Sequence, residues 1–126
     1  MMKPDIELHR VYDHSSVAPG RYRVLVDRLW PRGVRRDDLV HDAWPKDLAP
    51  SPELRRWFGH KPEHWAEFHQ RYAAELKDES RQQALAALLH DADGRPITLL
   101  YGAKDPERNH ALVLRDALLR AAREKS

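Results

Sequence analysis

Two short apolar segments, each followed at once by cationic and aromatic residues, limit what this chain can fold into. The first is Val24-Leu25-Val26, which leads into Asp27-Arg28-Leu29-Trp30-Pro31-Arg32-Gly33. The second is Ile97-Thr98-Leu99-Leu100-Tyr101, which leads into Gly102-Ala103-Lys104. Runs of branched apolar side chains without alternation are typical of strands buried on both faces. Because a buried strand that ends in fixed polar groups is how α/β proteins build ligand sites, the sequence predicts a site at these two strand ends.

The rest of the chain predicts one α/β domain over residues 1–126. A helical crossover between two apolar strands favours parallel pairing, so we expect a short, mostly parallel sheet of about three or four strands flanked by about four helices. Strands are predicted over Ile6–Tyr12, over Tyr22–Arg28 as the central strand and over Ile97–Tyr101, with an edge strand or extended loop around Trp44. Helix starts are predicted at Ser51-Pro52-Glu53, near Pro62, at the Ser80–Gln83 capping box and at Asp105-Pro106-Glu107.

Charge and cysteine content narrow the class of protein. The chain has 22 basic and 20 acidic side chains, a net charge of +2, which does not match the strong basic excess of a general nucleic-acid binder. It has no cysteine, which excludes disulfides and thiolate chemistry. It also has no apolar run of about 18 residues and no signal peptide pattern after Met1, so we expect a cytoplasmic protein without a membrane span.

The two strand ends bring together residues suited to an anion. If the strands are parallel neighbours, the side chains of Asp27, Arg28, Trp30, Arg32, Tyr101 and Lys104 converge, and a helix start around Asn109 lies at the same edge. Free N–H groups at a helix start favour an anion, and the planar fork of arginine suits phosphate or carboxylate. In the structural alternative, Arg28 only pairs with Asp27 or another acid, and Arg32 is a solvated loop charge.

His110 is the candidate for catalysis. It lies beside the predicted pocket and histidine titrates near neutral pH, so it could transfer a proton; it could equally be a helix cap. The group His60, His64 and His69 does not have the spacing of a helical zinc motif, so the sequence predicts no metal site. No nucleotide fingerprint or serine nucleophile motif is present, and we expect no cofactor.

The chain resembles a known family, the YeaO-like bacterial proteins of domain-of-unknown-function family 488. The segments that carry the resemblance are Arg10-Val11-Tyr12, Tyr22–Gly33, Trp44, Leu48–Ser51, Glu53-Leu54-Arg55, Trp57-Phe58, Phe68, Tyr72, Glu75-Leu76, Leu99–Lys104 and Asn109-His110-Ala111. The resemblance implies a compact cytoplasmic bacterial α/β domain and supplies no established activity or cofactor. Lys46, Ser51 and Arg55 belong to matched segments, and the loop Ala49-Pro50-Ser51 could fold over the pocket.

Three functions remain open from the sequence. The first is a binding protein or enzyme for a small anionic ligand, with Arg28, Arg32 and Lys104 as charge clamps and Trp30 and Tyr101 as walls. The second is a nucleic-acid-associated or regulatory module that uses the same basic edge. The third is a purely structural interaction partner. The sequence does not determine the ligand, the reaction or the oligomeric state.

Overall fold

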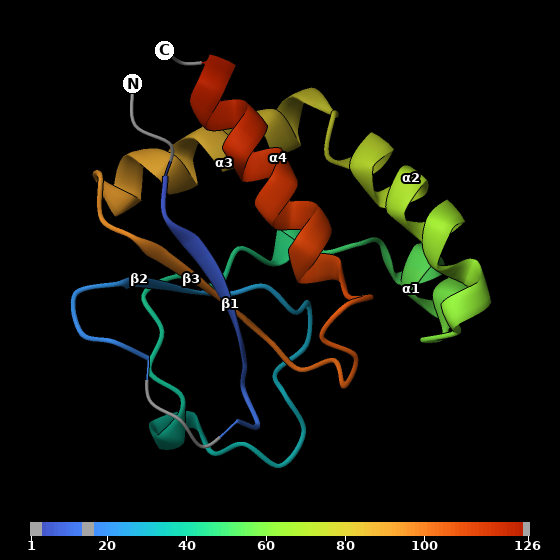
Figure 1. Cartoon of the computed structure of the whole chain (residues 1–126), viewed down its shortest axis with the longest axis horizontal. Helices are drawn as coiled ribbons and strands as arrows, with labels where there is room; N and C mark the ends of the chain where they lie inside the picture. Colours follow the sequence, from blue (N-terminus) through green and yellow to red (C-terminus); the bar gives the residue numbers. More distant parts are fainter. Residues whose placement is uncertain (1–3, 14–16, 125–126) are drawn as a thin grey trace.

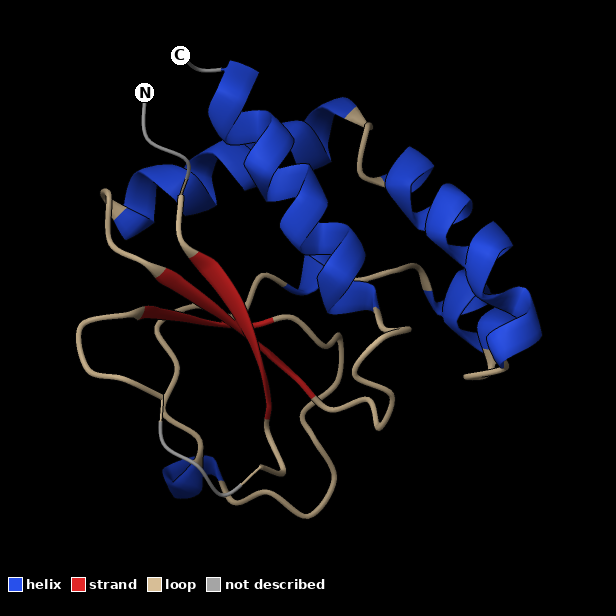
Figure 2. Cartoon of the chain, viewed as in Figure 1, coloured by secondary structure: helices blue, strands red, loops and turns tan. Residues whose placement is uncertain are grey.

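The centre of the fold is a three-stranded parallel sheet with the strand order β1–β3–β2 (Figures 1 and 2). The computed structural model describes residues 4–13 and 17–124. Its elements are β1 (Ile6–Arg10), β2 (Tyr22–Leu25), α1 (Pro52–Phe58), α2 (Trp65–Glu75), α3 (Glu79–Ala92), β3 (Ile97–Tyr101) and α4 (His110–Glu124), with short 3-10 turns at Arg36–Asp38, Lys46–Leu48 and Pro62–His64. The predicted α/β fold with a short parallel sheet and four helices is therefore confirmed.

The middle strand is β3, not the strand predicted to be central. All five residues of β3 are buried, because it has a neighbouring strand on each side and side chains packed on both faces. β2 is shorter than predicted, since the ladder ends at Leu25, and it lies at an edge of the sheet. Its outer side is partly covered by the segment around Ala43, whose carbonyl accepts from the N–H of Leu25 at 2.9 Å. β2 and β3 are nevertheless parallel neighbours, as the sequence predicts.

The two faces of the sheet are covered differently. Figure 1 shows the four α-helices on one face, and Leu99 of β3 points into the large core that they form. Leu100 points to the other face, where it packs with Leu25 and with loop side chains that include Trp30 and Trp44. Full burial of a leucine side chain stabilises the fold by roughly 1.5–3 kcal/mol. The loops after β2 are therefore fixed by their own apolar anchors rather than by a helix.

The helix starts follow the sequence in α1 but not in α3. The Oγ of Ser51 accepts from the N–H of Leu54 at 3.2 Å, as predicted, and Gly59 ends α1 in the left-handed conformation at φ 53°. The prediction of a capping box that begins at Ser80 is wrong. Asp78 occupies the cap position of α3 and Ser80 already lies in the first turn, where its hydroxyl donates to the Asp78 carboxylate.

α4 begins at His110, so the helix start predicted at Asp105-Pro106-Glu107 is wrong. The carboxylate of Asp105 accepts from the N–H groups of Glu107 and Arg108, at 2.9 and 3.2 Å, and this closes a separate turn. Asn109 then caps the helix, since its Oδ1 accepts from the N–H of Leu112 at 3.3 Å. Because α4 begins later than predicted, His110 lies in its first turn, at the carboxyl edge of the sheet.

Candidate functional site

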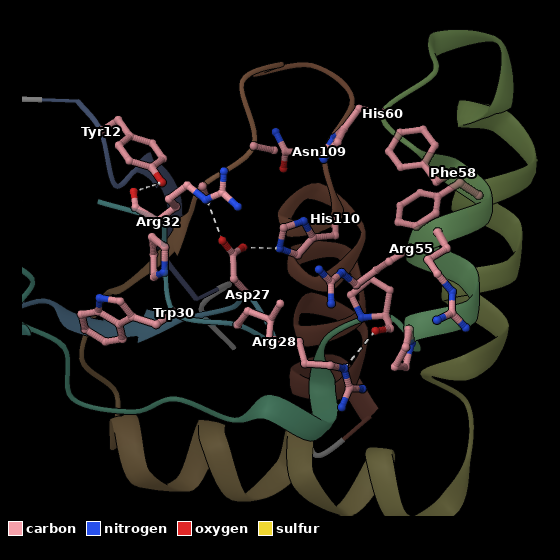
Figure 3. Close-up of a pocket in the computed structure, with 18 residues that line it drawn as sticks. Tyr12, Asp27, Arg28, Trp30, Arg32, Arg55, Phe58, His60, Asn109 and His110 are labelled. Atoms are coloured by element: carbon pink, nitrogen blue, oxygen red, sulfur yellow. Dashed lines mark hydrogen bonds and ion pairs between the residues drawn. The ribbon is translucent and has the colours of Figure 1, made fainter. Parts of the chain in front are cut away.

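A hollow of about 690 Å³ lies where β2 and β3 end, and it is called the main hollow below. Asp27 and Arg28 reach it from the chain that follows β2, and Gly102 and Ala103 from the chain that follows β3 (Figure 3). The start of α4 and the helix α1 close its other sides. Its wall consists of Tyr12, Asp27, Arg28, Leu29, Trp30, Pro31, Arg32, Pro50, Pro52, Arg55, Arg56, Phe58, His60, Phe68, Gly102, Ala103, Asn109 and His110.

A close contact between the side chains of Asp27 and His110 lies in the wall of the main hollow. The Oδ1 of Asp27 is 2.7 Å from the Nε2 of His110, and Figure 3 shows the two side chains pointing toward each other. Both atoms are shielded from solvent, and neither has another hydrogen-bond partner within the described ranges. The second carboxylate oxygen, Oδ2, accepts from the N–H of Gly102 at 3.0 Å. The pair therefore joins the ends of β2 and β3 to the start of α4.

Gly102 is a glycine because the carboxylate of Asp27 lies so close to it. A Cβ atom on Gly102 would lie 2.8 Å from the Oδ2 of Asp27 and 3.7 Å from the Cε2 of Tyr12. The first distance is too short for a real contact, so any side chain here would displace the carboxylate. On its other side Asp27 is held by Trp44, whose indole N–H donates to the Asp27 carbonyl at 2.7 Å. Backbone and carboxylate of Asp27 are thus both fixed.

The main hollow is electropositive. Its wall holds four arginines, Arg28, Arg32, Arg55 and Arg56, and a single carboxylate, that of Asp27. Arg28 is half-buried and donates from Nε to the carbonyl of Pro50 and from Nη2 to that of Ala49, each at the long distance of 3.4 Å. The other three arginines are exposed. None of the four makes an ion pair with any described acidic residue, so their charges are available to a bound anion.

The structure brings six of the eight predicted site residues to one hollow. Asp27, Arg28, Trp30, Arg32, Asn109 and His110 all line the main hollow. Trp30 forms one side of it, and its indole N–H donates to the carbonyl of Val34 at 2.7 Å. Pro50, from the loop expected to fold over the pocket, also lines it.

The other two predicted residues lie elsewhere. Tyr101 is buried in the large core and lines no hollow described here; burial raises the pKa of its phenol. Lys104 lines an adjoining space of about 710 Å³, called the second hollow below. The chain turns away after Gly102, so Lys104 is carried past the main hollow.

Among the wall residues that were not predicted from the sequence are Arg56, Phe58 and His60. All three belong to α1 or to the turn after it, and the helix itself was predicted. What the sequence does not show is that α1 packs beside the sheet edge. The stacking of Phe58 on Phe68 of α2, with ring centroids 4.2 Å apart, fixes that position. The aromatic residues at helical spacing indicate a core, but they do not indicate which edge of the sheet it adjoins.

Two negative findings apply to the described residues, 4–13 and 17–124. No group of three or more histidine, cysteine, aspartate or glutamate side chains there could hold a metal ion. No helix in these ranges has both the length and the apolar composition that crossing a membrane requires.

The fold and the main hollow define a small parallel α/β domain with an electropositive pocket at the carboxyl edge of its sheet. The chain belongs to the DUF488 family, since the family model described as the inactive DUF488-N3 subclade matches residues 5–126. It is 46% identical over 114 residues to the uncharacterized protein YeaO of Escherichia coli (strain K12), covering 90% of this chain and 96% of YeaO. It is 42% identical over 113 residues to the uncharacterized protein Rv3073c of Mycobacterium tuberculosis (strain H37Rv), covering 90% and 92%. No solved structure matches it. The resemblance to YeaO-like proteins is thereby confirmed.

Proposed function

We propose that this protein binds a small anionic ligand, one that bears phosphate or carboxylate groups, in the main hollow. The observation that carries the proposal is the charge imbalance of the wall. Four arginines face one acid, and that acid is already engaged by His110 and by the N–H of Gly102. Guanidinium groups without acidic partners bind phosphate and carboxylate through paired, charge-assisted hydrogen bonds.

The size and lining of the main hollow support a small ligand. Its volume, about 690 Å³, lies within the usual range for small-molecule sites. Trp30, Phe58 and Phe68 supply apolar wall, while the arginines lie around it. Ligand sites commonly combine an apolar lining with a few fixed polar groups that set orientation.

Binding without turnover is the form of the proposal that the family description favours, because it calls this subclade inactive. The Nε2 of His110 is occupied by Asp27, and its Nδ1 makes no hydrogen bond within the described residues. Nδ1 can therefore contact a ligand. Proton transfer by His110 stays a prediction, and loss of a measured turnover in His110→Ala would be its test.

Anion titration of the purified protein tests the proposed function. Inorganic phosphate and citrate are titrated calorimetrically at fixed ionic strength, because surface charge interactions are screened by salt. The double variant Arg32→Ala, Arg55→Ala removes two exposed wall arginines, and we expect its affinity to fall at least tenfold, since each lost charge-assisted hydrogen bond costs about 1.5–3 kcal/mol.

The double variant Arg120→Ala, Arg123→Ala is the matched control, because it also removes two positive charges and both arginines are exposed on α4 and line neither hollow. It should bind both anions like the wild-type protein. Equal weakening by the control and by the variant of the two wall arginines would mean that only net charge matters, and the proposed site would be refuted.

A further inference from the structure

The second hollow is continuous with the main hollow. The two share five wall residues, Tyr12, Phe58, His60, Gly102 and Ala103, so that one space opens into the other. The main hollow has a volume of about 690 Å³ and the second hollow one of about 710 Å³. The two adjoining hollows together are called the groove below.

The second hollow is electropositive like the first. Its wall holds Arg10, Lys104 and Arg108 and one carboxylate, that of Asp105. The Asp105 carboxylate is already engaged, because Oδ1 accepts two backbone N–H groups and Oδ2 lies 3.4 Å from the guanidinium of Arg108. Lys104 is exposed and makes no ion pair within the part of the chain that the structure describes. The groove therefore has a cationic region at each end.

The wall shared by the two hollows is aromatic and contains no acid. The Tyr12 side chain is exposed, at 36%, and its hydroxyl donates to the carbonyl of Arg32 at 2.7 Å. The guanidinium of Arg10 lies over the same ring, 4.9 Å from its centroid. Tyr12 is thus held between the main hollow and the second hollow. Nucleobases stack on aromatic side chains of this kind, while neighbouring cations contact the phosphates of the backbone.

We propose that the groove binds one ligand with two anionic groups and one planar ring, the chemistry of a nucleoside whose ribose carries phosphates at both its 3′ and 5′ positions. One phosphate occupies the main hollow, the other lies near Lys104, and the nucleoside lies along the wall that contains Tyr12. This inference rests on the proposed function, since it uses the main hollow as one of two anion sites. Such a unit occurs as a free nucleotide and within a single nucleic-acid strand.

Calorimetric titration with adenosine 3′,5′-bisphosphate, adenosine 5′-monophosphate and inorganic phosphate tests this inference. We expect the bisphosphate to bind about tenfold more tightly than the monophosphate, because it gains a second charge-assisted contact. Lys104→Met keeps the apolar stem and removes the charge, so it should abolish that gain while the monophosphate binds as before. Lys77→Met is the matched control, because Lys77 is exposed and lines neither hollow, and it should change nothing.

The outcomes separate this inference from the proposed function. If the bisphosphate and the monophosphate bind equally, or if Lys104→Met leaves the difference intact, the inference is overturned and the single anion site stands. If none of the three binds, both are overturned. Titration with a short oligodeoxyadenylate distinguishes a free nucleotide from a nucleic-acid strand as the ligand. Tighter binding of the oligonucleotide than of the bisphosphate, with a steep salt dependence, supports a strand, and tighter binding of the bisphosphate supports a free nucleotide.

Discussion

Substitution of Gly102 by alanine should destabilise the protein through a single contact. The new Cβ would lie 2.8 Å from the Oδ2 of Asp27, so the carboxylate has to move and the hydrogen bond from the Gly102 N–H is strained or lost. Overpacking of this kind costs about 1–3 kcal/mol, and a lost hydrogen bond to a charged group costs about 1.5–3 kcal/mol. Against these costs stands a gain of about 0.4–1 kcal/mol, because alanine restricts the unfolded chain.

The net cost of Gly102→Ala should be roughly 2–5 kcal/mol in the free energy of unfolding, measured by urea titration. For a domain of this size that lowers Tm by roughly 8–20 °C. The cost should depend on Asp27, and a double-mutant cycle shows whether it does. Asp27→Ala is itself destabilising, because it leaves the buried Nε2 of His110 and the Gly102 N–H without a partner. In that background, however, the Cβ meets no carboxylate, and Gly102→Ala should cost less than about 0.5 kcal/mol.

Two results would refute this reasoning. The first is a Gly102→Ala cost that is the same with and without the Asp27 carboxylate, which would place its origin in the backbone. The second is an unchanged free energy of unfolding for Gly102→Ala in the wild-type background. That would mean that the chain at the end of β3 shifts to accommodate the Cβ without losing stability. Either result would also weaken the view that Asp27 and Gly102 form a rigid wall of the main hollow.

Two further substitutions test contacts that hold α1 and the segment before it. Burial raises the pKa of Tyr72, so it stays neutral in the folded protein; the stability this provides is complete below pH about 10 and is lost as the pH rises, by about 1.4 kcal/mol per pH unit. Tyr72→Phe should make that alkaline fall in urea stability shallower, and at neutral pH it should cost about 1–3 kcal/mol, because the buried carbonyl of Leu48 loses its donor. An unchanged alkaline slope would contradict the assignment. Ser51→Ala should cost about 1–2 kcal/mol in the same assay, because Ser51 caps α1 through Leu54 and its hydroxyl donates to Glu75 at 2.7 Å. If Ser51→Ala lowers the free energy of unfolding no more than the same substitution of an exposed serine does, the assignment of Ser51 as the cap of α1 is contradicted.

The sequence was sufficient for the strands and for the edge where the site lies. Buried parallel strands need unbroken apolar segments, and Val24-Leu25-Val26 and Ile97–Tyr101 are the segments of this kind. Parallel pairing of β2 with β3 then brings the two strand ends to one edge without further information. Order within the sheet was not predictable, because both strands are equally apolar. β3 is central only because β1 pairs with it as well.

The sequence was not sufficient for features that depend on how a loop turns. Asp105-Pro106 satisfies the local rule for a helix start, yet the Asp105 carboxylate closes a turn and α4 begins at His110. The same loop carries Lys104 into the second hollow rather than the first. In each case the local sequence permits more than one path, and contacts with distant segments select one. Arg55 and Arg56 reach the main hollow for the same reason, through the packing of α1 on α2.

The partner of Asp27 argues against one form of the structural alternative, an ion pair between Asp27 and Arg28. In the structural alternative the acid neutralises Arg28, its neighbour in the chain, and the site would then have no charge to offer a ligand. Instead the carboxylate is taken by His110 and the Gly102 N–H, and Arg28 contacts only the carbonyls of Ala49 and Pro50 over long distances. A carboxylate so engaged still lowers the mutual repulsion of the surrounding arginines in the empty protein. Since it lies against His110 and accepts from the Gly102 N–H, it leaves the guanidinium donors of those arginines to the anion that we propose.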